Sequence, residues 1–175
     1  LAMPRMWRGK WIALSGDGTL AASLDQAGLV GVYNVVRGKR VALVEPGAGK
    51  ITSAAFADDG RILVTASPDS ISLWNMPSGT LKKAIKLPEK EYLSITKLVL
   101  SSDGATVAAF ASRPNPRLRD ADPRVKHLRS MRIAPELWGI EIFNVAAGKA
   151  CGRIDGMLFA LSPDSRTLAK PGYKC

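Results

Sequence analysis

The phrase LSGDGTLA at residues 14–21 decides the fold, because similar phrases return three more times along the 175 residues. The further copies are FADDGRIL (56–63), LSSDGATV (100–107) and LSPDSRTL (161–168). An Asp-Gly pair between two apolar runs is a strong hairpin signal, since glycine tolerates a positive φ and aspartate caps its own turn. Each copy therefore predicts two strands joined by a turn. The turn aspartates are Asp17, Asp59, Asp103 and Asp164.

A second phrase recurs three times and reads aromatic-Asn-(Val/Met)-x-x-Gly-(Lys/Thr). Its copies are YNVVRGK (33–39), WNMPSGT (74–80) and FNVAAGK (143–149), with the aromatics Tyr33, Trp74 and Phe143 and the glycines Gly38, Gly79 and Gly148. The aromatic follows the aspartate by 16, 15 and 40 residues, so the third unit carries about 25 extra residues. Each aromatic ends an alternating apolar strand, and we expect all three to be buried.

The segments around these phrases predict strands of two kinds. Before each aromatic, apolar residues alternate with Gly31, Ser72 or Glu141, and this period of two indicates one buried face. The segments before each turn aspartate are more uniformly apolar, which is typical of strands buried on both faces. One position in these segments always holds a residue that is small enough to let neighbouring sheets approach closely. It is held by Ala13, Ala55, Val99 and Ala160.

A period near 42 residues with four short strands per unit is typical of a β-propeller. The chain resembles the WD40 family, in particular its bacterial WD40-like relatives. LSSDG at 100–104 resembles the turn between the first two strands of a blade, and SISLWN at 70–75 resembles the strand that ends in Trp-Asp. The Trp-Asp pair appears here as Tyr-Asn, Trp-Asn and Phe-Asn. The only histidine is His127, so the buried His–Asp network of many members cannot form.

The resemblance implies an all-β fold of four-stranded antiparallel blades that form an incomplete ring in one chain. Residues 1–175 are then a single partial propeller, with blades near 10–47, 51–88 and 94–155 and a half blade at 156–175. Propellers typically have about four to eight blades, and an open end leaves unpaired strand edges. Three remedies stay open: a longer polypeptide, as the start at Leu1 and the end at Cys175 suggest, a homodimer completing the ring, or another protein.

Residues 113–136 form a basic insertion within the third unit. Residues 113–132 contain seven Lys/Arg and two Asp, a net charge of +5 and thus half of the net +10 of the chain. Asp122 and Pro123 are suited to cap and begin a short helix there. The candidate binding residues are Arg117, Arg119, Arg124, Lys126, Arg129 and Arg132. The insertion either binds a polyanion or is a solvated loop without a ligand.

We find no catalytic, metal or cofactor motif in the sequence. PGAGKI at 46–51 lacks the first glycine and the Ser/Thr of a phosphate loop. His127 has no evident Ser or Cys partner, and Cys151, expected to be at least half-buried in an outer strand, belongs to no metal-ligand cluster. No apolar run approaches the roughly 18–20 residues of a membrane span.

These observations favour a non-enzymatic protein-interaction scaffold without cofactors, whose partner is another protein or the rest of its own propeller. Two alternatives stay open. One is polyanion or nucleic-acid binding through the basic insertion, which follows from its charge. The other is a larger propeller enzyme, with its site at the centre of a complete ring and its catalytic residues outside this segment.

Overall fold

The computed structural model describes residues 10–25, 27–45, 51–57, 59–88, 92, 94–114, 136–155, 160–161 and 168–169. Within these ranges every regular element is a β-strand, and the strands form three four-stranded sheets and one two-stranded sheet. All strand pairs are antiparallel. The predicted all-β fold of four-stranded sheets in an unclosed ring is confirmed. Across the described ranges, no helix has the length and apolar character needed to cross a membrane.

Each four-stranded sheet is a meander in which every strand pairs with the next one along the chain. Sheet one consists of β1 (Lys10–Leu14), β2 (Leu20–Leu24), β3 (Val30–Asn34) and β4 (Lys39–Val44). Sheet two consists of β5 (Ser53–Phe56), β6 (Ile62–Ala66), β7 (Ser70–Asn75) and β8 (Thr80–Lys86). Sheet three consists of β9 (Ser94–Leu100), β10 (Thr106–Pro114), β11 (Glu136–Asn144) and β12 (Lys149–Asp155). A short hairpin of β13 (Ala160–Leu161) and β14 (Leu168–Ala169) follows.

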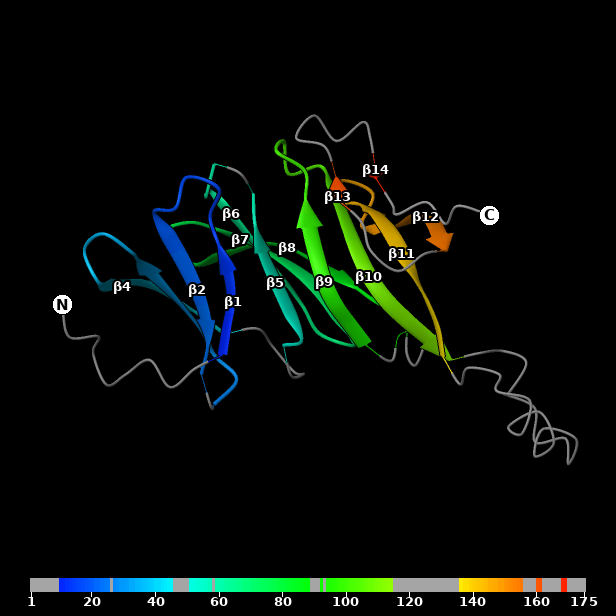
Figure 1. The fold of residues 1–175 in the computed structure, drawn as a ribbon, viewed down its shortest axis with the longest axis horizontal. Helices are drawn as coiled ribbons and strands as arrows, with labels where there is room; N and C mark the ends of the chain where they lie inside the picture. The colour runs from blue at the N-terminus through cyan, green and yellow to red at the C-terminus, as the bar shows by residue number, and fades with distance from the viewer. Residues whose placement is uncertain are drawn as a thin grey trace, which may run out of the picture.

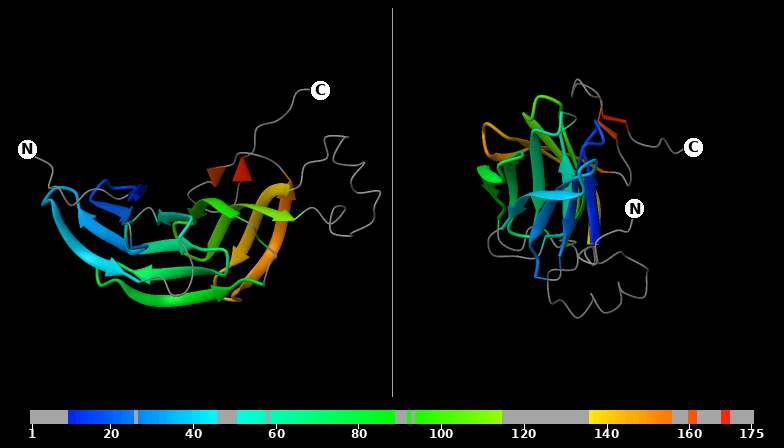
Figure 2. Two further views of the ribbon diagram at one scale, coloured as in Figure 1. Left: turned by 90° about the horizontal axis from the view of Figure 1, so that it is seen from below. Right: turned by 90° about the vertical axis from the view of Figure 1, so that its left-hand side faces the viewer.

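The sheets follow one another in chain order along an arc, and β13 contacts β9 of sheet three (Figure 1). The first strands β1, β5 and β9 are neighbours in space, and the last strands β4, β8 and β12 lie on the convex side of the arc (Figure 2). This arrangement stacks the sheets face to face, so each interior face is buried against the next sheet.

Two apolar cores lie between the stacked sheets. Sheets one and two are joined by side chains from their facing surfaces: Ala22, Val30, Val32, Ala42, Val44, Ala54, Phe56, Leu63, Trp74 and Met76. Sheets two and three are joined in the same way by Val64, Ala66, Ile71, Leu73, Ile85, Leu98, Leu100, Val107, Ala109, Phe143 and Val145. Sheet two therefore contributes one face to each core.

The third strands differ from the expected single buried face. In β7, Ser72 and Trp74 are buried together with Ile71 and Leu73, and in β11 the charged Glu141 is buried as well. The prediction was wrong because it treated each strand as part of a sheet with one solvent face. Sheet two has neighbours on both sides and therefore buries both of its faces, and in sheet three the face of Glu141 is the one turned toward sheet two.

The expectation of burial on both faces of the first strands is wrong for Leu14, which is exposed. Phe56 and Leu100, at the same place in the repeat, are buried. The difference arises because Phe56 packs between sheets one and two and Leu100 between sheets two and three. No described sheet precedes sheet one to cover Leu14 in the same way.

A β-bulge lies at the same place in all three sheets, directly before the aromatic of the second phrase. Here two residues of the last strand oppose one residue of the third strand, and the extra residues are Val41, Lys82 and Cys151. The extra residue of a bulge is left out of the ladder, and all three of these residues are exposed. The expectation that Cys151 is at least half-buried is therefore wrong, since its thiol is free and the residue is exposed.

Candidate interaction site

The turn aspartates of the first and third units cap their own hairpins. Ser15 Oγ donates to Asp17 Oδ1 at 2.6 Å, and Ser101 Oγ donates to Asp103 Oδ1 at the same distance. Each carboxylate also accepts a backbone N–H two residues further on. The serine hydrogen bond is the main reason why the pKa of Asp17 and the pKa of Asp103 lie below the ordinary value of 3.8.

The turn of the second unit has a simpler arrangement. Ala57 stands where the other two turns have serine, and Asp59 accepts the backbone N–H of Arg61 at 2.9 Å. Asp164, the fourth turn aspartate, lies outside the described residues. The three described aspartates belong to separate turns, each bonded to its own hairpin, and this arrangement suits a structural rather than a catalytic role.

The aromatics of the second phrase occupy equivalent positions with different burial. Trp74 and Phe143 are buried, whereas Tyr33 is half-buried, so the expectation of burial is wrong for Tyr33. Trp74 lies in the core between sheets one and two, and Phe143 lies in the core between sheets two and three. Trp74 Nε1 also donates to the buried Thr65 Oγ1 at 3.0 Å. Each buried aromatic thus packs toward the preceding sheet.

The glycines of the second phrase complete the turn between the third and fourth strands. Gly38, Gly79 and Gly148 have φ values of 63°, 70° and 65°, in the left-handed region that favours glycine. Their N–H groups donate to the carbonyls of Asn34, Asn75 and Asn144 at 2.8–2.9 Å. In the third turn, Lys83 of sheet two donates to the carbonyl of Ala146 at 2.7 Å, so the turn is also bonded to the preceding sheet.

The six candidate binding residues of the basic insertion lie outside the described residues: Arg117, Arg119, Arg124, Lys126, Arg129 and Arg132. His127 and the predicted helix start at Asp122 and Pro123 lie outside them as well. The structure does describe the two strands that flank the insertion. Arg113 near the end of β10 pairs with Leu137 near the start of β11, and Pro114 pairs with Glu136.

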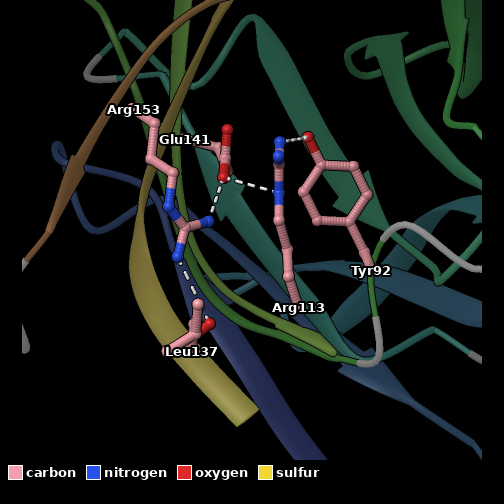
Figure 3. A network of polar contacts seen from close by, with 5 residues as sticks. All are labelled: Tyr92, Arg113, Leu137, Glu141 and Arg153. Carbon is pink, nitrogen blue, oxygen red and sulfur yellow. Dashed lines mark hydrogen bonds and ion pairs between the residues drawn. The ribbon is translucent and has the colours of Figure 1, made fainter. Parts of the chain in front are cut away.

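A network of polar side chains holds these flanking strands together (Figure 3). Its centre is the buried Glu141, whose Oε1 lies 2.9 Å from Arg113 Nε and also forms an ion pair with Arg153 Nη1. Arg113 Nη2 donates to Tyr92 Oη at 2.7 Å, and its guanidinium lies 4.7 Å from the centre of the Tyr92 ring. Arg153 Nη2 donates to the carbonyl of Leu137 at 3.3 Å.

The network joins three strands of sheet three to Tyr92, which precedes the sheet. Two guanidinium groups share one carboxylate, so the burial of Glu141 is compensated by ion pairing. Gly139 makes room for this arrangement, because a Cβ there would lie 2.8 Å from Arg153 Nη2. The network therefore fixes both ends of the basic insertion relative to the sheet.

Sequence reasoning missed this network. Glu141 was recognised only as the residue between two isoleucines, where alternation predicts solvent exposure. A usable signal was the position of Arg113 and Glu141 on either side of the insertion, because two flanking strands that pair bring such residues together. In the described part of the chain, no three His, Cys, Asp or Glu side chains are placed to hold a metal ion.

No protein-family model matches the chain. Two rice proteins (Oryza sativa subsp. japonica) are similar to it. The small ribosomal subunit protein RACK1z is 32% identical over 102 residues, which cover 56% of this chain and 30% of the relative. The small ribosomal subunit protein RACK1y is 30% identical over the same length and with the same coverage. The match thus spans less than a third of the length of these relatives.

RACK1 is a WD40 propeller protein. The similarity and the stacked four-stranded sheets together support a WD40-like propeller.

Proposed function

We propose that this chain is a non-enzymatic protein-interaction scaffold of the bacterial WD40-like type. Its sheets are blades at 10–47, 51–88 and 94–155, followed by a half blade at 156–175. The observation that carries the proposal is the repeated stack of sheets, in which the motif residues serve turns and cores. A rigid stack leaves its connecting loops free for recognition, whereas a catalytic site needs converging reactive groups.

The similar rice proteins add support of a general kind. Both are named as proteins of the small ribosomal subunit, that is, as parts of an assembly and not by a reaction. A fold alone does not determine a specific function, and we therefore propose only the class of function.

Affinity purification with the chain as bait, followed by titration of the purified partner, tests the scaffold proposal. We expect a saturable complex of fixed stoichiometry in which the partner keeps its intact mass. Val36 is exposed on the turn after β3, and Val36→Asp is therefore a variant that changes the surface. Its unfolding temperature shows whether the variant is still folded. Loss of a covalent group from the partner, or turnover of a small substrate, would favour the enzyme alternative.

We propose second that the basic insertion is a polyanion contact. Residues 113–132 concentrate a net +5, while the rest of the chain spreads a net +5 over far more residues. Local charge density decides whether a polyanion is held at physiological salt, where screening sets in at about 8 Å. The ion-pair network at Glu141 supports this proposal, because it fixes the two strands from which the insertion leaves.

A further inference from the structure

The outer edge of sheet two is its last strand, β8, which lies on the convex side of the arc (Figure 2). β8 pairs with β7 along one edge, and no described strand pairs with its other edge. An edge strand presents alternate backbone N–H and C=O groups with which a further strand is able to pair. Both faces of sheet two are packed against described sheets, so this edge is the side that the sheet leaves for a partner.

The side chains of β8 combine positive charge with exposed apolar surface. Lys82 and Lys86 are exposed, Lys83 is half-exposed, and Leu81 is 53% exposed. The strand contains no acidic residue. Within the described ranges, none of the ion pairs involves these lysines. The edge is therefore basic and its charge is not neutralised by a described carboxylate.

The lysines of β8 differ in what they contact within the chain. Lys83 donates to the carbonyl of Ala146 in sheet three at 2.7 Å, so it already joins two sheets. Lys82 is the extra residue of the bulge, next to the exposed Leu81, and Lys86 is the last residue of the strand. Lys82, Lys86 and Leu81 are thus the side chains that a strand added to this edge would meet.

The exposed leucine beside the charges favours a peptide over a nucleic acid as the occupant. β8 contains no aromatic residue on which a base would stack. Phosphate groups would contact the lysines and leave Leu81 uncovered. An extended peptide in which acidic and aliphatic residues alternate matches both. Lysines on an edge also discourage pairing between like-charged copies of this chain, so the edge admits an acidic strand more readily than its own kind.

We propose that β8 docks an extended acidic segment of a partner protein, which adds a strand to the outer edge of sheet two. Backbone hydrogen bonds along the edge give the affinity, and side chains at alternate positions give the specificity. Carboxylates of the segment pair with Lys82 and Lys86, and an aliphatic side chain covers Leu81. The proposal rests on the scaffold role proposed above and names its surface and its class of partner.

Fluorescence anisotropy with a labelled peptide of alternating glutamate and valine, titrated with the full chain, tests the proposal. We expect saturable binding that the double variant Lys82→Glu/Lys86→Glu weakens by about tenfold or more, because two attractions become repulsions. The matched control is Arg37→Glu/Arg61→Glu, which changes the net charge equally at exposed positions on turns outside β8. This control should bind like the wild type, and unfolding temperatures should show that both variants are folded.

A second peptide separates strand addition from attraction between charges. N-methylation of alternate backbone nitrogens keeps every carboxylate and removes the N–H groups that a paired strand uses, so binding should be lost. Equal binding of both peptides overturns the proposal. So do the absence of binding by the wild type, an equal loss in the control variant, and heparin binding at β8 in place of the acidic peptide.

Affinity purification with Lys82→Glu/Lys86→Glu as the bait distinguishes failure of this proposal from failure of the scaffold role. A partner that the wild type and the folded variant bind with equal affinity overturns docking at β8 and leaves the scaffold role standing. A wild-type chain that forms no complex with any protein overturns both.

Discussion

Replacing Trp74 tests the central claim that the aromatics join neighbouring sheets. The side chain is buried between sheets one and two, where it packs with Val32 and Val44. Trp74→Ala removes the whole indole from a core that cannot collapse without moving a sheet. Replacing a large aromatic residue in a core by alanine lowers the free energy of unfolding by about 3–5 kcal/mol. We expect a loss in this range.

The hydrogen bond from Trp74 Nε1 to Thr65 Oγ1 allows a finer test. Trp74→Phe keeps most of the packing but leaves the buried Thr65 hydroxyl without this donor, at a cost of about 1–3 kcal/mol. Sheet three already has the apolar version of the pair, with Phe143 and Ala109 at the equivalent positions. The double variant Trp74→Phe/Thr65→Ala removes both partners and should cost less than the two single variants added together.

Denaturant unfolding followed by far-ultraviolet circular dichroism measures these differences without relying on tryptophan fluorescence. The comparison requires that the slope of the unfolding free energy against denaturant concentration is the same in all variants. The conservative control is Val36→Ala, at a highly exposed position on the turn after β3, which should change the free energy of unfolding by less than about 0.5 kcal/mol. A loss below about 1 kcal/mol for Trp74→Ala would place the indole at the surface and refute the register of sheet two.

Three further outcomes are expected. Glu141→Gln should destabilise the protein by about 3 kcal/mol or more in denaturant melts, because two partly buried guanidinium groups lose their counter-charge. Ser101→Ala should raise the pKa of Asp103 toward 3.8 in an NMR titration. A lowered pKa stabilises the folded state above the unfolded value, and this contribution is lost as pH falls below 3.8, so the variant should lose less stability on acidification. Deleting residues 114–133 should preserve the strand spectrum and abolish retention on heparin at moderate salt; equal retention would show a solvated loop.

The fold could be predicted because its signals are local. An Asp-Gly turn between apolar runs, or an aromatic five residues before a turn glycine, depends on a few neighbouring residues. Each of these signals occurs three times along the chain, which makes the pattern clear. The exposure of Leu14, the half-burial of Tyr33 and the outward turn of Cys151 could not be predicted in this way. They depend on which sheets stack against which faces and on a bulge that only the strand register reveals.

Glu141 shows why the candidate site was harder to predict than the fold. Alternation between Ile140 and Ile142 placed it on a solvent face, a conclusion that holds for an isolated sheet. In the stack that face is interior, and the charge is tolerated only because Arg113 and Arg153 reach it from the two neighbouring strands. The ion pairs lie within sheet three, and Arg113 is close to the point where the insertion leaves the sheet. The Glu141→Gln variant separates the stability of the fold from the charge of the insertion. Retention on heparin should weaken along with stability if the position of the insertion matters, and should persist in the folded variant if its charge alone suffices.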